Sequence, residues 1–156
     1  MQVRIATASD ASTISALCAD VQRLHATAIP MFYKPASPET FPAATVCELM
    51  ASPDRRIFVA EVEGEIAGYV YVELQRQPES PFVYAMDIVY VHHISMRPFL
   101  RRSGIGTELM KAVDAWAKER HASTIKLHVC AFNAPAIAFY ENSGFEHLSL
   151  GMTMQA

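Results

Sequence analysis

The chain has 156 residues, of which 51% are hydrophobic and 19% charged, and this composition predicts one soluble globular domain over residues 1–156. Its net charge of −3 argues against broad nucleic-acid binding, which requires a basic face. The three cysteines lie far apart without paired spacing, and no run approaches the ~20 apolar residues of a membrane span. We therefore expect a cytoplasmic protein with reduced thiols that contacts neither nucleic acid nor membrane.

The first fifty residues predict one strand and one long amphipathic helix. Residues Val3 to Ala6 alternate between apolar and polar side chains, as in a strand. From Ala28 to Pro42 four prolines exclude one long helix, and this apolar loop is expected to pack on the core or on a substrate. Residues Ala43 to Met50 then form a short helix. The first helix extends to about His25, with apolar residues at three- and four-residue steps: Ile14, Leu17, Val21 and Leu24.

The middle of the chain predicts an antiparallel meander of three strands. Residues Ile57 to Val62 and Ile66 to Leu74 are rich in β-formers, and Glu63-Gly64 between them supplies a hairpin turn. A third strand-like run extends from Phe82 to Met96 and is expected to break near Asp87. Because short loops join these strands, consecutive strands should pair antiparallel.

Helices and strands alternate in the last third of the chain. Residues from Gly104 to about Arg120 have one apolar face and form the most regular helix of the sequence. The run from Ile125 to Cys130 is typical of a strand in a sheet interior. Asn133 then caps a second helix that ends before Gly144, and residues Phe145 to Met154 close the chain as a strand.

The turn between the third strand and the long helix has the features of an anion site. Pro98 ends the strand, and Gly104 and Gly106 lack the Cβ atoms that would keep a ligand away from the backbone. The first N–H groups of the helix have no partner inside it, and the helix dipole favours a phosphate there. Arg101 and Arg102 add positive charge. The sequence therefore predicts a phosphate- or pyrophosphate-binding turn.

The residues of this turn disfavour two common nucleotides. A Walker loop requires lysine after its last glycine, but Thr107 follows Gly106. A dinucleotide fingerprint requires a third glycine where this chain has Leu109. The remaining pattern, Pro-x-x-Arg-x-x-Gly-x-Gly from Pro98 to Gly106, resembles the acyl-CoA-binding motif of the GNAT superfamily of N-acyltransferases. Taken alone, a Gly-x-Gly pair is also found in ordinary turns.

A second stretch resembles the other GNAT signature. The segment Asn133 to Phe145 contains Asn-x-x-Ala-x-x-Phe-Tyr followed by Gly-Phe. The resemblance covers residues 57–150 well and the first fifty more loosely. It implies an α/β (α+β) fold with a mixed, mostly antiparallel central sheet of six to seven strands and about four flanking helices. In that fold the fourth and fifth strands splay apart, here around Ile94–Met96 and Leu127–Cys130, and the CoA pantetheine arm lies between them.

The resemblance also implies that acetyl-CoA is the acetyl donor, with no metal. Backbone groups of Ile94–Met96 would pair with the pantetheine, and amides from Arg102 to Thr107 would hold the pyrophosphate. Asn133 would contact the pantetheine arm besides capping its helix, or would act as a cap alone. The CoA-binding residues predicted in this way are Ile94, Ser95, Met96, Arg101, Arg102, Ser103, Gly104, Ile105, Gly106, Thr107, Asn133 and Tyr140.

Tyr140 is the predicted general acid. It lies two helical turns after Asn133 in the second signature, where a phenol can reach the CoA sulfur. A phenol with a pKa near 10 can donate a proton to a departing thiolate whose acid has a pKa of roughly 8 to 9. The alternative is a half-buried structural aromatic residue.

The general base departs from the family pattern. Many members have a glutamate on the fourth strand where this chain has Tyr90 to His93. Strand alternation predicts that Tyr90, His92, Ile94 and Met96 share one face and that His93 and Ser95 lie on the other. We therefore expect His92 to face the cleft, where a neutral imidazole can accept the amine proton.

Other assignments of the basic group remain open. His128 and Asp87 are the next candidates for the base. A zinc site on His92, His128 and Cys130 is disfavoured because these residues lack a dedicated ligand spacing.

The function expected from this resemblance is transfer of an acetyl group from acetyl-CoA to a primary amine by direct attack. The acceptor is open among small amines, antibiotics, polyamines, peptide N-termini and protein lysines. The alternatives are a CoA-binding sensor without chemistry and a phosphate- or nucleotide-binding domain. Because exposed strand edges in this family often pair, a homodimer is also expected.

Overall fold

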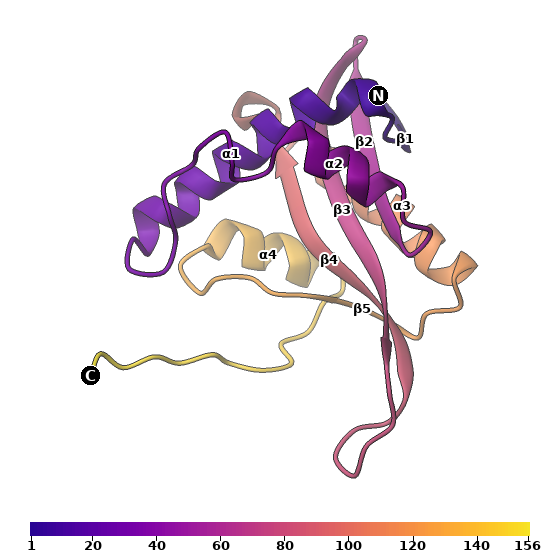
Figure 1. Ribbon diagram of the computed structural model, residues 1–156, viewed down its shortest axis with the longest axis vertical. Helices are drawn as coiled ribbons and strands as arrows, with labels where there is room; N and C mark the ends of the chain where they lie inside the picture. Colours follow the sequence, from indigo (N-terminus) through magenta and orange to yellow (C-terminus); the bar gives the residue numbers. More distant parts are fainter.

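Five strands form one sheet in the computed structural model, which describes residues 1–156 (Figure 1). Their order in the sheet is the order in the sequence. The first four strands pair antiparallel, and the last pairs parallel to its neighbour. The strands are β1 (Gln2–Ile5), β2 (Arg55–Val62), β3 (Glu65–Gln77), β4 (Met86–Met96) and β5 (Thr124–Leu127).

The central hairpin follows from its turn residues. Glu63 and Gly64 have φ angles of 53° and 81°, which match the two left-handed positions of a tight hairpin turn. Such a turn fits the right-handed twist of the flanking strands, so β2 and β3 pair directly across it. The predicted turn and antiparallel meander are confirmed.

Helices cover both faces of the sheet (Figure 1). Helix α1 and helix α2 pack on one face, whereas α3 packs on the other. The predicted apolar stripe of α3 is buried, because its members point at the sheet: Ile105, Leu109, Val113 and Trp116. The helices are α1 (Ala11–Ala28), α2 (Ala43–Met50), α3 (Ile105–Glu119) and α4 (Ala134–Asn142), with short 3-10 turns η1 (Ala8–Asp10) and η2 (Pro98–Leu100).

Three expectations about the strands are wrong in detail. The sheet has five strands and not six or seven, because the segment 145–154 is extended but pairs with no other strand. Strand β4 begins at Met86 and continues through Asp87 without a break. The strand is irregular further along. Tyr71 of β3 pairs with His93, but the next residue, Val72, pairs with Val91, so the pairing skips His92. None of the helices is both long and apolar enough to cross a membrane.

Candidate active site

Strands β4 and β5 part near the position that the family resemblance implies. Their parallel pairing ends at Val91 and Leu127, whereas β4 continues to Met96 with β3 as its only neighbour. The last five residues of β4 therefore keep one edge of backbone N–H and C=O groups unpaired by strands. The side chain of Ser95 is buried and donates a hydrogen bond of 2.9 Å to the carbonyl of Leu17, which anchors this end of β4 to α1.

Six consecutive backbone N–H groups lie free where α3 begins. The first backbone bond of the helix joins the N–H of Glu108 to the carbonyl of Gly104 at 3.1 Å, and no N–H from Arg102 to Thr107 donates within the chain. We call these residues the amide cluster (Arg102–Thr107). Arg102 and Gly104 have φ angles of 67° and 85°, and this left-handed backbone turns the chain into the helix. Free amides at a helix N-terminus favour an anion.

Gly106 also lies at a close packing contact. A Cβ atom at Gly106 would lie 3.0 Å from the ring of Phe139 and 3.4 Å from the sulfur of Met96. The residue is small because α4 and β4 pack against α3 here. At Gly104, by contrast, a Cβ would meet no atom within 4 Å, so the positive φ angle alone explains that glycine.

Helix α4 presents the second signature. The side-chain oxygen of Asn133 accepts a hydrogen bond of 3.3 Å from the N–H of Ala136, so the predicted N-cap is confirmed. Tyr140 is buried between Phe139 and Phe145. Burial raises the pKa of Tyr140 to about 12. Its phenol therefore keeps its proton at neutral pH and can act as a donor.

The two adjacent histidines of β4 lie on the same face, contrary to the predicted alternation. The ring of Tyr71 stacks on His92 with centroids 4.8 Å apart and meets the edge of His93 at 5.8 Å. The cause is the β-bulge between Val91 and His93, which inserts His92 as an extra residue and reverses the alternation beyond it. Val91 and Ile94 consequently both pack toward α3, and both histidines lie toward α1 and α2.

His92 forms a pair with a carboxylate from the neighbouring strand. Its Nε2 lies 2.9 Å from Oε2 of Glu73, and the Nε of Arg55 donates to Oε1 of Glu73 at 2.8 Å. The pKa of Glu73 is lowered, because the hydrogen bonds from Arg55 and His92 outweigh its desolvation by burial. Glu73 then fixes the ring of His92 with Nε2 toward the carboxylate and Nδ1 available to accept a proton. Glu73 is not predicted from the sequence, because its contact with His92 depends on the β-bulge.

His93 lies in a different environment, although it is next in sequence. Its Nδ1 is 3.8 Å from Sγ of Cys18 and 3.4 Å from the hydroxyl of Tyr69, and the ring of Phe41 meets it edge-on. Burial, with a smaller contribution from the charge of His92, lowers the pKa of His93 to about 4. His93 is therefore a neutral, weakly basic member of the core at physiological pH.

The other candidates for the base are not brought together with this pair. His128 is exposed in the segment that follows β5, and Asp87 lies opposite Arg76 near the start of β4. No group of three histidine, cysteine, aspartate or glutamate side chains has the geometry to hold a metal ion.

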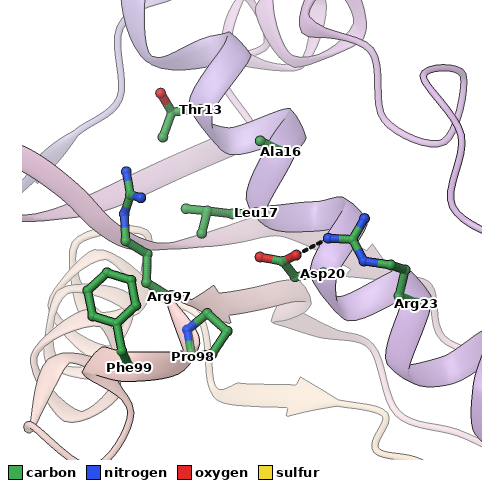
Figure 2. Close-up of a pocket in the computed structure, with 8 residues that line it drawn as sticks. All are labelled: Thr13, Ala16, Leu17, Asp20, Arg23, Arg97, Pro98 and Phe99. Atoms are coloured by element: carbon green, nitrogen blue, oxygen red, sulfur yellow. Dashed lines mark hydrogen bonds and ion pairs between the residues drawn. The ribbon is translucent and has the colours of Figure 1, made fainter.

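A pocket of about 340 Å³ lies between α1 and η2 (Figure 2). Leu17, Asp20 and Arg23 line it from α1, and Arg97 and Phe99 face them from the chain that leads into the amide cluster. Asp20 and Arg23 form an ion pair on the helix side. The pocket lies beside α1, and Arg97 and Pro98, which follow directly on the end of β4, form part of its wall.

Two proteins with similar sequences are named N-alpha-acetyltransferases. The chain is 30% identical over 120 residues to an N-alpha-acetyltransferase from Sulfurisphaera tokodaii, which covers 74% of this chain and 71% of that protein. It is 28% identical over 154 residues to an N-alpha-acetyltransferase from Sulfolobus acidocaldarius, covering 96% and 82% of the two chains.

Solved structures share the fold over the whole chain. A mutant of protein BH1408 from Bacillus halodurans superposes with a TM-score of 0.95 at 22% identity, covering 100% of this chain and 99% of that one. Aminoglycoside N-acetyltransferase AAC(6')-Iy in complex with CoA has a TM-score of 0.76 at 14% identity, covering 99% and 98%.

The family assignment follows from the sequence match. The model of the acetyltransferase (GNAT) family matches residues 21–145, which include β4, the amide cluster and α4. These are the elements that carry both sequence signatures. The chain belongs to the GNAT family of acetyltransferases.

Proposed function

We propose that this protein transfers an acetyl group from acetyl-CoA to a primary amine of a small molecule, peptide or protein. The observation that carries the proposal is the amide cluster beside the unpaired edge of β4, since these two features offer hydrogen-bond donors for a pyrophosphate and a strand edge for an amide-containing arm. A solved neighbour with the same fold has CoA bound. Acetyl-CoA supplies the activated thioester carbonyl for this chemistry.

The residues present fit a CoA ligand. The N–H groups of the amide cluster would hold the pyrophosphate, with the charges of Arg101 and Arg102 nearby. The backbone of Ile94–Met96 would pair with the pantetheine, and Asn133 would contact the same arm from the start of α4. Because these contacts come from the backbone, Met96 is compatible with the site.

Tyr140 would supply the proton that the leaving sulfur needs. Its pKa of about 12 keeps the hydroxyl protonated, and no group of the protein accepts a hydrogen bond from it. A neutral phenol donates to a developing thiolate, which is the stronger hydrogen-bond acceptor.

His92 would take the proton of the attacking amine. Glu73 orients its ring and stabilises the imidazolium that forms, and the bulge at His92 lies one residue beyond the point where β4 and β5 part. An amine is mostly protonated at neutral pH, so a group that removes its proton raises the fraction able to attack.

The first experiment is a panel assay. Free CoA would be measured after incubation of the protein with acetyl-CoA and amines of four kinds: polyamines, aminoglycosides, peptides with free N-termini and lysine peptides. We expect turnover with at least one kind. Tight acetyl-CoA binding in a thermal-shift assay without turnover on any amine would favour the sensor alternative, and a shift with ATP only would favour a nucleotide-binding domain.

Replacement of Tyr140 by phenylalanine should lower kcat by about 10²-fold or more with little change in acetyl-CoA affinity, because the variant loses a proton donor but keeps the packed ring. The comparison variant is Tyr33→Phe, which also removes a hydroxyl but lies in the loop after α1. An unchanged kcat in Tyr140→Phe under conditions where chemistry limits the rate would assign this tyrosine a structural role.

Replacement of His92 by glutamine should lower kcat/KM most near neutral pH and less at high pH, where free amine is abundant. Glu73→Gln should give a smaller loss with the same pH dependence, since it removes the orienting carboxylate and leaves the imidazole. His93→Gln serves as the neighbouring control and should leave the shape of the profile unchanged. If His92→Gln keeps the parent profile, the proton leaves through His128, Asp87 or solvent.

A further inference from the structure

The pocket between α1 and η2 contains a fixed cation that none of its lining residues neutralises. The backbone N–H of Arg97 donates to the carbonyl of Ala67 at 2.8 Å, and its Nε donates to the carbonyl of Ile66 at 2.7 Å. These two bonds hold the side chain on the start of β3. The Nη1–Nη2 edge of the guanidinium remains, and it donates to no atom of the chain. Glu65 lies 3.7 Å from Nη2, but its side chain is 81% exposed, so water screens its charge.

The opposite wall of the pocket, which α1 provides, is neutral. Asp20 and Arg23 pair with each other there, so their charges cancel. The hydroxyl of Thr13 lines the same wall and makes no hydrogen bond within the chain. In Figure 2 the side chain of Leu17 points from α1 toward Arg97. One positive charge and one free hydroxyl therefore face an otherwise neutral space.

Apolar side chains supply the rest of the lining. The ring of Phe99 is 77% exposed, so it remains open to a ligand at the η2 side of the pocket. The volume of about 340 Å³ is at the lower end of the range for small-molecule sites, which combine an apolar lining with a few polar groups that fix orientation. The other apolar lining residues are Ala16, Leu17 and Pro98.

A neighbouring pocket shows which side of Arg97 suits an anion. It has a volume of about 290 Å³ and shares Arg97 and Phe99 with the first pocket. Glu63 and Glu65 also line it, and their carboxylates would repel an anion. The first pocket has one carboxylate, Asp20, which is already paired. An anion is therefore favoured on the α1 side of Arg97.

We propose that the pocket between α1 and η2 binds a small organic carboxylate with an apolar or aromatic body. The free Nη1–Nη2 edge of Arg97 offers two parallel N–H groups, which match the two oxygens of a carboxylate. Thr13 would donate a further hydrogen bond, and the body of the ligand would lie between Leu17 and Phe99. This inference does not depend on the proposed acetyl transfer.

The pocket is connected to the amide cluster through η2. Arg97 and Phe99 precede the cluster in the chain, and the hydroxyl of Ser103 donates to the carbonyl of Leu100 at 2.5 Å. A carboxylate in the pocket would contact the segment from which the amide cluster starts. We expect it to bind together with CoA and not in competition with it.

Titration with phenylacetate tests the chemical class of the ligand, with phenylacetamide as the neutral counterpart of the same shape. Each compound is added to ¹⁵N-labelled protein, and chemical-shift changes are followed by NMR. We expect phenylacetate to bind with a Kd of roughly 1 mM, as is usual for so small a ligand, and to shift the signals of Thr13, Arg97 and Phe99. Phenylacetamide should bind at least about tenfold more weakly. Equal binding of the two compounds, no binding of either, or shifts confined to other residues would overturn the proposal.

Two variants test the site itself. Ala16 is exposed on α1 and lines the pocket, so Ala16→Leu fills the space with a good helix former and should abolish binding. Ser12→Leu places the same side chain outside the pocket and should keep the parent Kd. Arg97→Met should weaken phenylacetate binding about tenfold or more, whereas the double variant Asp20→Asn, Arg23→Gln removes a neutral pair and should change it little. A parent Kd in Ala16→Leu would contradict the proposal, even if Arg97→Met does not fold.

A competition experiment tests whether the pocket is separate from the CoA site. The Kd of CoA is measured by isothermal titration calorimetry without phenylacetate and with phenylacetate near saturation. A Kd that is unchanged or lower means that both ligands are bound at once and supports the proposal. A Kd that rises in proportion to the phenylacetate concentration would mean a shared site and would overturn it. If CoA does not bind at all, the proposed acetyl transfer fails, and the phenylacetate titrations still decide the role of the pocket.

Discussion

At the scale of single residues, His92 and His93 show how neighbours in sequence acquire different properties. His92 is partly exposed and paired with Glu73, whereas His93 lies among Cys18, Tyr69 and Phe41. In the first arrangement a carboxylate lies within hydrogen-bond distance of the imidazole. The second disfavours the charged form, because burial removes water without supplying a partner.

The low pKa of His93 predicts a loss of stability in mild acid. In the folded protein this pKa is about 4, against 6.5 for an unperturbed histidine, so the unfolded chain binds the proton more readily between these values. The contribution is complete above about pH 6.5 and falls as the pH drops toward 4. Between pH 7 and pH 5, His93 should account for about 2 kcal/mol of lost unfolding free energy.

Urea denaturation of the parent and of His93→Gln at pH 7 and pH 5 measures this contribution. The variant lacks the titrating group, so its stability should change less with pH than that of the parent. The stabilising contribution of Asp10 is nearly constant in this range: hydrogen bonds to Arg4 lower its pKa from 3.8 to about 2, so the contribution is lost only as the pH falls below about 4. Equal pH dependence in both proteins would contradict the proposed environment of His93.

At the scale of elements, Gly106 sets how closely α3, α4 and β4 approach. Gly106→Val should lower the unfolding free energy by about 1–3 kcal/mol, because the new side chain overlaps the ring of Phe139. Adding Phe139→Leu should recover part of this loss, giving a coupling free energy of at least about 0.5 kcal/mol in a double-mutant cycle.

Gly104→Ala is the matched control for that cycle. A Cβ at Gly104 meets open space, so this variant is strained only by its φ of 85° and should show no coupling to Phe139→Leu. Strictly additive effects of Gly106→Val and Phe139→Leu would disprove the contact.

The elements themselves were largely predictable from sequence, whereas their irregularities were not. Apolar periodicity located α1, α3 and the meander, and turn residues located the hairpin at Glu63-Gly64. The bulge at His92 left no such signal, because it depends on how β3 and β4 match over their length. The strand pattern of residues 145–154 was recognised, but a single chain offers it no partner.

The candidate site was likewise predictable in its local features but not in the contacts between distant residues. The amide cluster and the cap at Asn133 follow from local sequence, since glycine, proline and asparagine determine backbone geometry within a few residues. The pair of His92 with Glu73 joins residues on two strands, so its prediction requires the pairing register of β3 and β4. The packing of Gly106 against Phe139 of α4, thirty-three positions away, could not be predicted from local sequence.

At the scale of the whole molecule, one sheet separates two apolar cores. The core on the α1 face includes Ile14 and Tyr69, and the core on the α3 face includes Ile105 and Val70. Tyr69 and Val70 are consecutive in β3, so the same strand contributes to both cores with alternate side chains. Neither core can lose its packing without disturbing the strand that the other core uses, and the two should unfold together.

This coupling through β3 predicts a single unfolding transition with additive local effects. Ile14→Val and Ile105→Val each remove one buried methyl group and should each cost about 0.5–1.5 kcal/mol of unfolding free energy. The two residues lie on opposite faces of the sheet and share no partner, so the double variant should lose the sum within about 0.5 kcal/mol. The measurement is urea denaturation followed by far-UV circular dichroism and by the fluorescence of Trp116, which lies in the α3 core. All proteins are compared at one protein concentration. If the two signals change at the same urea concentration, the protein unfolds as one cooperative unit. If Ile105→Val shifts the urea midpoint of the fluorescence change and Ile14→Val does not, the α3 core unfolds by itself.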